Sequence, residues 1–404
     1  MEHLLSQKID DNFYYIGVND RITHKFEGMW PIPNGVAYNS YLVKGKANIL
    51  IDSVKLNRIT VFLERLYDAL EGEDLDYIII DHIEPDHSSG LTTIMDNYPN
   101  TKIVCNKRTL PFLKNYYNIE DNIIVVKDKE TITLGDKRYT FYTTPMVHWP
   151  ESMVCYDEDD KILFSQDIFG GFGTLDGAIF DDQIDFDSQY LDETRRYYIN
   201  IVGKYSKQAL AALNKLSHLD IKMICPDHGP IWRKDPSKIL NLYTSLAKQE
   251  TVDGVLIVYG SMYGNTEQMA ELVAQGVVEG GIGVVKVSDI TKVDMSYILS
   301  DTWKYKGVIL GSCSYDNNIF PPMGYLLSDL SHQKMKNNIW GAFGSFSWSG
   351  GAVKRLKGFL EEEKLNYIET IPEIQGAANP KEAEELKELG REVARRILKA
   401  SEEK

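Results

Sequence analysis

The chain has 404 residues, of which 43% are hydrophobic and 25% charged, a composition typical of a globular protein with a buried core. Its formal net charge of −15 argues against a nucleic-acid backbone or an acidic membrane surface as a partner. No apolar run approaches the ~20 residues of a membrane span, and the start lacks a secretion signal. Four scattered cysteines without a C-x-x-C pair exclude a rubredoxin-type iron site within the chain and favour a reducing cytoplasm.

The first part of the chain reads as short strands interspersed with helices. Apolar residues recur at three- and four-residue spacing over 58–70 and 188–216, which predicts helices there. A first domain over residues 1–250, with mixed sheets and helices, is therefore expected. Strands are expected at 13–18, 38–43, 47–52, 77–81, 102–105, 123–126, 139–144, 161–165 and 222–225.

A regular alternation of strands and helices begins at residue 254, after the periodicity fades near residue 250. It predicts a second domain over residues 254–404, an α/β fold with a doubly wound parallel sheet of five strands. The last helix, rich in Glu, Lys and Arg, is interpreted as an amphipathic face that closes this sheet. Four of these strands are placed at 254–259, 283–287, 307–310 and 338–343. Helices are expected near 266–280, 294–300, 322–330, 351–361 and 380–402.

A hexad dense in potential metal ligands follows the apolar run 77–80. It reads His82-Ile83-Glu84-Pro85-Asp86-His87. A loop at the end of a strand fixes such side chains while leaving them accessible. Three further candidates, His148, Asp167 and His228, also follow apolar runs. Four of the eight histidines thus lie at strand ends, which favours a metal site over an acidic, solvated turn.

The ligand types indicate which metal is bound. His82, Glu84 and His148 make one set of two imidazoles and a carboxylate, and Asp86, His87 and His228 make a second, with Asp167 free to bridge. Such sets suit non-haem iron, and three carboxylates make the ferric state accessible. A zinc hydrolase, the alternative, would normally use more imidazole. Weaker candidates are His24, Tyr197 and Tyr198 as donors to bound oxygen and Trp149 as a shield, although packing or ordinary hydrogen bonding explains each equally well.

Three loops at strand ends in the second domain predict a flavin site. The loop 261–266 precedes a helix and contains no Lys or Arg, which suits a monophosphate such as FMN better than a di- or triphosphate. Tyr315 and Trp348, in the other two loops, are the expected stacking groups. The candidate residues are Ser261, Met262, Tyr263, Gly264, Asn265, Thr266, Ser312, Cys313, Ser314, Tyr315, Asp316, Asn317, Ser345, Phe346, Ser347, Trp348, Ser349 and Gly350.

The pattern His82-x-Glu84-x-Asp86-His87, followed by His148, Asp167 and His228, resembles the ligand set of the flavodiiron proteins. The likeness covers the whole chain. It implies a metallo-β-lactamase-like αββα domain followed by a flavodoxin-like domain, with two non-haem irons and one FMN per protomer. The first ligand set would bind one iron, the second set the other, and Asp167 would bridge them. FMN would pass electrons singly to the irons, which would reduce dioxygen to water.

Within this family, the general run of sequence is most similar to the coenzyme F-420-dependent oxidases of methanogens. That similarity implies reduced coenzyme F-420 as an external electron donor. The sequence contains no C-x-x-C pair for a rubredoxin iron and no G-x-G-x-x-G fingerprint for a nicotinamide dinucleotide, so an external electron donor is expected. A separate rubredoxin is the alternative donor, and nitric oxide the alternative substrate. The family also implies a head-to-tail homodimer or a dimer of dimers. A pure electron carrier, the non-enzyme alternative, would require the metal loop to be structural.

Overall fold

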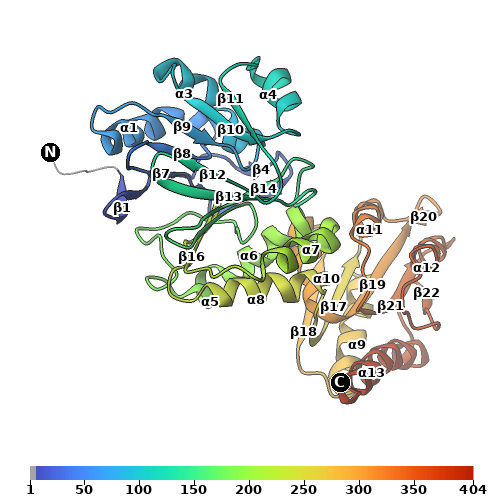
Figure 1. Cartoon of the computed structure of the whole chain (residues 1–404). Helices are drawn as coiled ribbons and strands as arrows, with labels where there is room; N and C mark the ends of the chain where they lie inside the picture. Colours follow the sequence, from blue (N-terminus) through green and yellow to red (C-terminus); the bar gives the residue numbers. More distant parts are fainter. Residues whose placement is uncertain (1–5, 404) are drawn as a thin grey trace. The chain divides into compact units, whose positions relative to one another are not determined.

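A computed structural model describes residues 6–403; residues 1–5 and 404, the outer ends of the two expected domains, lie outside it. The chain divides into two compact units between Ala247 and Lys248. Figure 1 draws the first unit from blue to green and the second from yellow to red. Among the described helices, none is long and apolar enough to cross a membrane.

The first unit contains two large β-sheets. One has seven strands in the order β1-β2-β7-β8-β9-β10-β11, and the other has five, β12 to β16, in chain order. The seven-stranded sheet comprises β1 (Gln7–Asp10), β2 (Phe13–Tyr15), β7 (Tyr41–Val43), β8 (Ile49–Ile51), β9 (Tyr77–Ile79), β10 (Lys102–Asn106) and β11 (Ile123–Val126). The five-stranded sheet comprises β12 (Glu130–Leu134), β13 (Lys137–Thr143), β14 (Met153–Asp157), β15 (Ile162–Gln166) and β16 (Met223–Pro226). Two short ladders pair β3 (Val18–Asp20) with β6 (Val36–Tyr38) and β4 (Lys25–Phe26) with β5 (Trp30–Pro31).

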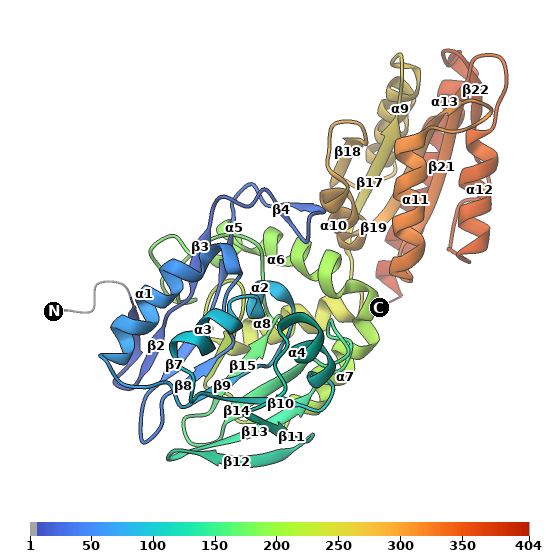
Figure 2. The same ribbon diagram turned by 90° about the horizontal axis from the view of Figure 1, so that it is seen from above.

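Helices cover the outer faces of the two sheets. The sheets themselves pack face to face, since the rings of Phe13 and Tyr41 lie 5.8 and 5.7 Å from that of Phe164. Figures 1 and 2 show α1, α3 and α4 beside the first sheet and α5 to α8 beside the second. The expected αββα layering is confirmed. The helices are α1 (Ile59–Leu70), α2 (Pro85–Ser88), α3 (Leu91–Asn97), α4 (Leu110–Tyr117), α5 (Phe186–Gln189), α6 (Leu191–Tyr197), α7 (Ser206–Leu216) and α8 (Pro236–Ala247), with a 3₁₀ turn at Leu56–Arg58.

Some expected elements are interrupted. The strands predicted at 13–18 and 38–43 were wrong as single strands, because the chain changes sheet within each. At the second change, the buried Asn39 side chain donates to the carbonyls of Pro226 and Gly229, both at 2.8 Å, and so turns the chain. The helix predicted over 188–216 is broken by a π-helical turn, Tyr198–Val202, and a 3₁₀ turn, Gly203–Tyr205. Several elements of the first unit were not predicted from the sequence, namely the strands β1, β4, β5, β12 and β14 and the helices α2, α3, α4 and α8.

The second unit is a parallel sheet in the order β18-β17-β19-β21-β22, with the hairpin strand β20 on β19. The doubly wound, flavodoxin-like sheet is confirmed, and its fifth strand, β22, lies outside the predicted ranges. Strand order reverses between β17 and β19, the place where such sheets bind ligands. The strands are β17 (Val252–Gly260), β18 (Val285–Asp289), β19 (Tyr305–Tyr315), β20 (Asn318–Ile319), β21 (Ile339–Phe346) and β22 (Glu373–Gln375). The helices are α9 (Asn265–Glu279), α10 (Met295–Lys304), α11 (Pro321–Gln333), α12 (Ala352–Glu362) and α13 (Pro380–Glu402).

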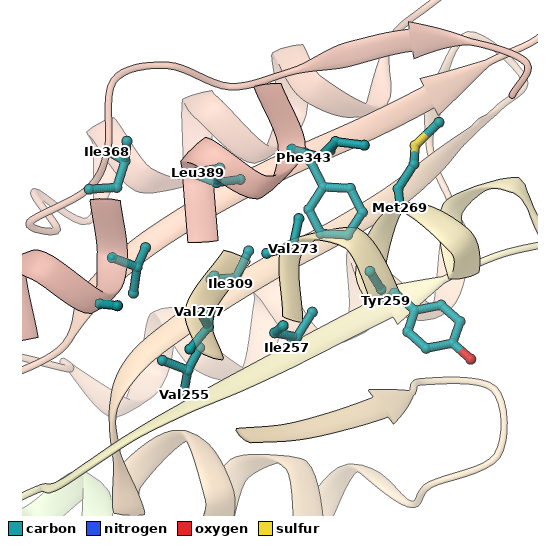
Figure 3. Close-up of a cluster of buried hydrophobic side chains, with 14 of the residues drawn as sticks. Val255, Ile257, Tyr259, Met269, Val273, Val277, Ile309, Phe343, Ile368 and Leu389 are labelled. Atoms are coloured by element: carbon teal, nitrogen blue, oxygen red, sulfur yellow. The ribbon is translucent and has the colours of Figure 1, made fainter. Parts of the chain in front are cut away.

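The core of the second unit lies between this sheet and the helices α9 and α13. Figure 3 shows Phe343 of β21 in one cluster with Met269 and Val273 of α9. The helices α9 and α13 approach so closely that a Cβ at Gly390 would lie 2.2 Å from the carbonyl oxygen of Val273. The terminal helix α13 therefore closes the sheet, as its amphipathic sequence predicted.

Candidate metal centre and flavin-binding loops

Four strand ends, drawn from both sheets of the first unit, carry the predicted metal ligands. The hexad follows β9, and Pro85 starts the short helix α2, which contains Asp86 and His87. The other three ligands are His148 between β13 and β14, Asp167 directly after β15, and His228 shortly after β16. All seven residues are buried, at 9% exposure or less. The structure thus brings together every metal ligand predicted from the sequence.

Asp167 lies between two pairs of imidazoles. Its Oδ2 is 3.0 Å from Nε2 of His148 and 3.5 Å from Nε2 of His82. Its Oδ1 is 3.2 Å from Nε2 of His87 and 3.3 Å from Nε2 of His228. Each carboxylate oxygen therefore faces one pair, which is the arrangement of a bridging ligand.

Each pair of imidazoles also has a carboxylate of its own. Glu84 Oε2 lies 2.9 Å from Nε2 of His148 and 3.1 Å from Nε2 of His82. Asp86 Oδ2 lies 3.4 Å from Nε2 of both His87 and His228. The predicted ligands consequently fall into two groups, His82, Glu84, His148 and Asp167 in one and Asp86, His87 and His228 in the other, and a third group joins His87 and Asp167 to Asp227.

The unsatisfied polar atoms of this cluster fit metal cations. Neither carboxylate oxygen of Asp86 or Asp167, nor Nε2 of His148, has a hydrogen-bond partner among the described residues. Nε2 of His87 and Nε2 of His228 face one another at 3.1 Å. Buried acceptors without donors are costly, and cations placed among these atoms would satisfy them. Imidazole and carboxylate together are ligands that suit iron.

Charge pairing controls the protonation of this cluster in the absence of a metal. Burial opposes ionisation, yet contacts with the histidines hold the pKa of Glu84 and Asp167 below the usual range. Burial likewise opposes protonation of His148 and His228, but their carboxylate neighbours raise the pKa of each to about 10. Without metal, His148 and His228 are therefore protonated at neutral pH, and a bound cation would displace those protons.

Further buried carboxyl groups lie behind the ligands, and sequence analysis missed them. Burial raises the pKa of Asp52 to about 7 and the pKa of Asp81 and Asp227 well above the usual range. Glu151 Oε1 lies 2.9 Å from Nδ1 of His82. A signal was present in the sequence, because an Asp directly precedes three of the four histidines, at positions 81, 86 and 227.

The weaker candidates occupy different environments. Tyr197 packs its ring 5.5 Å from that of His228, and its buried hydroxyl has no hydrogen-bond partner among the described residues. The Trp149 ring lies 5.5 Å from that of His82. By contrast, the Tyr198 hydroxyl is 3.0 Å from the hydroxyl of Ser206, and His24 is exposed and belongs to neither ligand group. Two aromatic neighbours of His228 went unnoticed in the sequence, Phe26 and Tyr38, at 5.3 and 5.7 Å.

The first flavin loop leaves the N-terminus of α9 open. Gly264, with a φ of +94°, occupies the N-cap position, and the described side chains provide no cap for the first amides of the helix. The Gly264 amide donates to Ser261 Oγ at 3.0 Å. Thr266 Oγ1 lies 2.8 Å from Ser345 Oγ, which ties this loop to the end of β21. Free amides and hydroxyl groups at a helix N-terminus fit a phosphate.

The strand before the second flavin loop was wrongly expected to end at residue 310, because β19 continues to Tyr315. Asp316 and Asn317, with φ of +49° and +54°, form the turn of a hairpin into β20. Ser345 and Phe346 similarly belong to β21 rather than to a loop. The predicted residues nevertheless gather at the carboxyl ends of β17, β19 and β21. Tyr263 and Trp348 are 92% and 88% exposed there, and Tyr315 is 45% exposed, so flat aromatic surfaces are available to a ring system.

A β-lactamase-like unit that fits two metal cations, followed by a flavodoxin-like unit, defines a class of two-domain proteins. Residues 36–229 match the ODP family beta lactamase, and residues 257–390 match flavodoxin. The chain is 33% identical to the anaerobic nitric oxide reductase flavorubredoxin of Escherichia coli over 397 residues. The aligned region covers 97% of this chain and 82% of that protein.

Solved structures of related proteins also match this chain over nearly its whole length. The rubredoxin oxygen:oxidoreductase of Desulfovibrio gigas matches with a TM-score of 0.93 and 32% identity, over 98% of this chain and 99% of that one. The flavodiiron protein of Giardia intestinalis matches with a TM-score of 0.94 and 27% identity, over 100% and 99%. The chain belongs to the flavodiiron protein family, which confirms the resemblance inferred from its ligand pattern.

Proposed function

We propose that this protein binds two non-haem irons and one FMN, and that it reduces dioxygen to water or nitric oxide to nitrous oxide. The observation that carries the proposal is the position of Asp167, whose two oxygens face separate pairs of imidazoles at 3.0 to 3.5 Å. In this assignment His82, Glu84 and His148 bind one iron, Asp86, His87 and His228 bind the other, and Asp167 bridges them. FMN binds at the carboxyl ends of β17, β19 and β21.

The protein's own residues contribute charge, enclosure and a proton donor. When bound, two ferrous ions and reduced FMN together hold four electrons, the number that reduction of one dioxygen to two waters requires. Glu84, Asp86 and Asp167 place three negative charges against the metals. The rings of Phe26, Tyr38 and Trp149 limit access of water to the imidazoles. The buried hydroxyl of Tyr197, which has no acceptor among the described residues, is available to donate a hydrogen bond to bound substrate.

The choice between dioxygen and nitric oxide rests on the named relatives. One is a nitric oxide reductase and another an oxygen oxidoreductase, and both are similar to this chain over nearly its whole length. The ligand set suits either gas, because each requires two adjacent metals with open positions. Stopped-flow reaction of the fully reduced protein with each gas separately tests the preference. A rate with one gas at least ten times that with the other would assign the substrate.

For the electron donor, the relatives favour a separate rubredoxin over reduced coenzyme F-420. Both the flavorubredoxin and the Desulfovibrio gigas protein have names that refer to rubredoxin. We propose a rubredoxin as the donor, and the 404 residues contain no C-x-x-C pair for a rubredoxin iron site. The predicted similarity to the coenzyme F-420-dependent oxidases is not borne out by these relatives, so reduced coenzyme F-420 becomes the alternative donor.

A donor experiment tests this part of the proposal. Oxygen consumption is measured with reduced rubredoxin, with reduced coenzyme F-420 and with NADH, each as the sole reductant, on protein of known iron and FMN content. We expect turnover with rubredoxin and none with NADH. Turnover with reduced coenzyme F-420 alone would reverse the donor assignment and leave the diiron site standing. Active protein that contained zinc and negligible iron would contradict the diiron proposal itself and favour a hydrolase.

A head-to-tail dimer is the assembly we propose for electron transfer. Tyr263 and Trp348 expose large aromatic surfaces at the flavin loops, and a second copy of the chain would cover them. The FMN of one subunit would then face the irons of its partner. Mixed dimers of an Asp167→Ala subunit and a subunit unable to bind FMN should regain part of the activity. No recovery, with mixed dimers shown to form, would favour transfer within one chain.

A further inference from the structure

A buried carboxylate lies behind one of the four histidines of the metal centre. Glu151 is 1% exposed and follows His148 by three residues in the connection between β13 and β14. Its Oε1 lies 2.9 Å from Nδ1 of His82 and accepts a hydrogen bond of 3.2 Å from the amide of Ile83. Its Oε2 is buried and has no donor in the part of the chain that the structure describes. The carboxylate of Glu151 therefore contacts two residues of the hexad, His82 and Ile83.

The neighbouring strand β10 holds Glu151 in place. Asn106 Nδ2 donates to the Glu151 carbonyl at 2.5 Å, and Arg108 Nη1 donates to the Pro150 carbonyl at 3.0 Å. The amide of Arg108 in turn donates to Asn106 Oδ1 at 2.8 Å, which fixes the Asn106 side chain. These bonds tie the loop at Pro150 and Glu151 to the end of β10 and the turn that follows it. The position of the carboxylate is thus set by the fold.

The Nδ1 atoms of His87 and His228 have weaker partners. Nδ1 of His228 lies 2.7 Å from the carbonyl oxygen of Ala37, a neutral acceptor. Nδ1 of His87 is 3.5 Å from Asp227 Oδ2 and makes no hydrogen bond among the described residues. Among these three histidines, His82 alone has a carboxylate at hydrogen-bond distance from Nδ1. The two halves of the metal centre are therefore supported unequally.

A carboxylate that accepts the Nδ1 hydrogen of an imidazole fixes its tautomer and increases electron donation from Nε2. Nε2 of His82 is the nitrogen that faces Glu84 and Asp167. We propose that Glu151 is a positioning residue that acts through His82, and that it makes the half-site of His82, Glu84 and His148 the stronger of the two for iron, above all for ferric iron. This inference rests on the proposed function, because it requires iron at both half-sites.

Two substitutions distinguish the effect of the charge of Glu151 from the effect of its side-chain length. Glu151→Gln keeps an oxygen that can accept from Nδ1 and from the Ile83 amide but removes the negative charge. Glu151→Asp keeps the charge but shortens the side chain by one methylene. Glu158→Gln is the matched control, since Glu158 lies seven residues further on, accepts a hydrogen bond from the Thr140 hydroxyl at 2.7 Å and contacts no metal ligand. Circular dichroism identifies the variants that fold.

The readouts are Fe²⁺ affinity and the potentials of the irons. Metal-free protein is titrated anaerobically with Fe²⁺ against a coloured chelator, and the loaded protein is then titrated potentiometrically with dithionite. We expect E151Q to bind one Fe²⁺ as the wild type does and the other about 10- to 100-fold more weakly. One ferric-to-ferrous step should move to a higher potential while the other stays in place. E151D should weaken the same half-site, so whichever variant folds gives the answer.

Two results would overturn the inference, and they are distinguishable. If wild-type protein takes up two irons and the folded variants bind both with unchanged affinity and potentials, Glu151 has no positioning role, and the diiron proposal stands. If the wild type takes up no iron, the proposed function fails and this inference fails with it. E158Q should match the wild type in both titrations, and an equal weakening there would also contradict a specific role for Glu151.

Discussion

The two candidate sites of this chain are built in opposite ways. The metal centre consists of charged residues that are buried, at 9% exposure or less, and that contact one another at about 3 Å. The flavin loops consist of glycines, hydroxyl groups and free amides, with aromatic rings that are up to 92% exposed. Buried charges need a partner, whereas exposed loops do not. The first site therefore depends on the pairing of its buried charges, with one another or with bound metals, and the second depends on the packing of the sheet beneath it.

The strongest test of this contrast removes the shared ligand. Asp167→Ala should lose iron from both half-sites and lower gas-reduction activity by at least about 100-fold. Loss of a residue that only contacts a metal ligand already lowers activity by up to about 100-fold. Iron analysis and oxygen consumption are the measurements, and FMN content should stay unchanged. Asp157→Asn is the control, because Asp157 is equally buried, on the neighbouring strand β14, but belongs to neither ligand group. Normal iron content in Asp167→Ala would contradict the bridging assignment.

The second test uses pH on the metal-free protein. The neighbouring carboxylates raise the pKa of His148 and His228 to about 10, against about 6.5 in an unfolded chain. A raised pKa contributes stability that is complete below the unfolded value and is lost as the pH rises through the folded value. The melting temperature of the first unit should therefore fall by several degrees between pH 7 and pH 10.

Calorimetry of chelator-treated and iron-loaded protein checks this prediction. In the loaded protein the metals replace the protons, so the fall should be much smaller. The transition of the second unit serves as an internal control, since its flavin loops contain no such buried pairs among the described residues. Equal pH dependence with and without iron would show that the imidazoles are not the source.

A third test addresses the packing that supports the flavin loops. Gly390→Ala places a methyl group 2.2 Å from the Val273 carbonyl, so it should destabilise the second unit by about 1–3 kcal/mol. Chemical unfolding followed by circular dichroism measures the change, and iron content should not respond. In the control, Gly358→Ala, the added methyl meets only the Glu362 side chain at 4.0 Å within helix α12 and should stabilise by about 0.5–1 kcal/mol. Equal effects at both positions would exclude close helix packing as the cause.

The smallest effect is expected at an exposed ring. If Trp348 stacks on the flavin, Trp348→Ala should weaken FMN binding by about 5- to 10-fold, which corresponds to roughly 1 kcal/mol. Quenching of FMN fluorescence by the apoprotein measures the affinity. Tyr67→Ala is the control, because Tyr67 is also exposed, at 69%, but lies on α1 of the first unit. Unchanged affinity in Trp348→Ala would remove this residue from the flavin site.

Sequence reasoning performed differently on the two sites. The metal ligands were predictable because imidazoles and carboxylates at strand ends are distinctive, and the parallel arrangement of strand ends brings them together. Glu151 was missed, because a single Glu in a loop gives no periodic or spacing signal and its role depends on the fold of β10 around it. The strand character of Tyr315 was missed for a similar reason. A hairpin turn at Asp316 and Asn317 looks like any polar loop until its positive φ angles are known.

The fold class could be predicted from the alternation of strands and helices. The interruptions within predicted elements could not, because they depend on tertiary contacts. The helix expected over 188–216 has the correct apolar spacing, but Tyr197 and Tyr198 are both completely buried. Successive residues of a regular α-helix point about 100° apart, so burial of both favours a local change of helix type. The π-helical turn that begins at Tyr198 supplies this change beside the metal centre. Such a break cannot be read from spacing alone, because the spacing itself stays regular.

The distance along the chain between facing ligands has a consequence for biosynthesis. His87 and His228, whose Nε2 atoms are 3.1 Å apart, are separated by 141 residues. Contacts between such distant positions form late, because a long loop must close before they can be made. A nascent chain that has emerged only as far as the hexad holds two imidazoles and two carboxylates but lacks His148, Asp167 and His228. The complete cluster therefore forms only after β16 has joined its sheet, and both half-sites can be filled only once the first unit has folded.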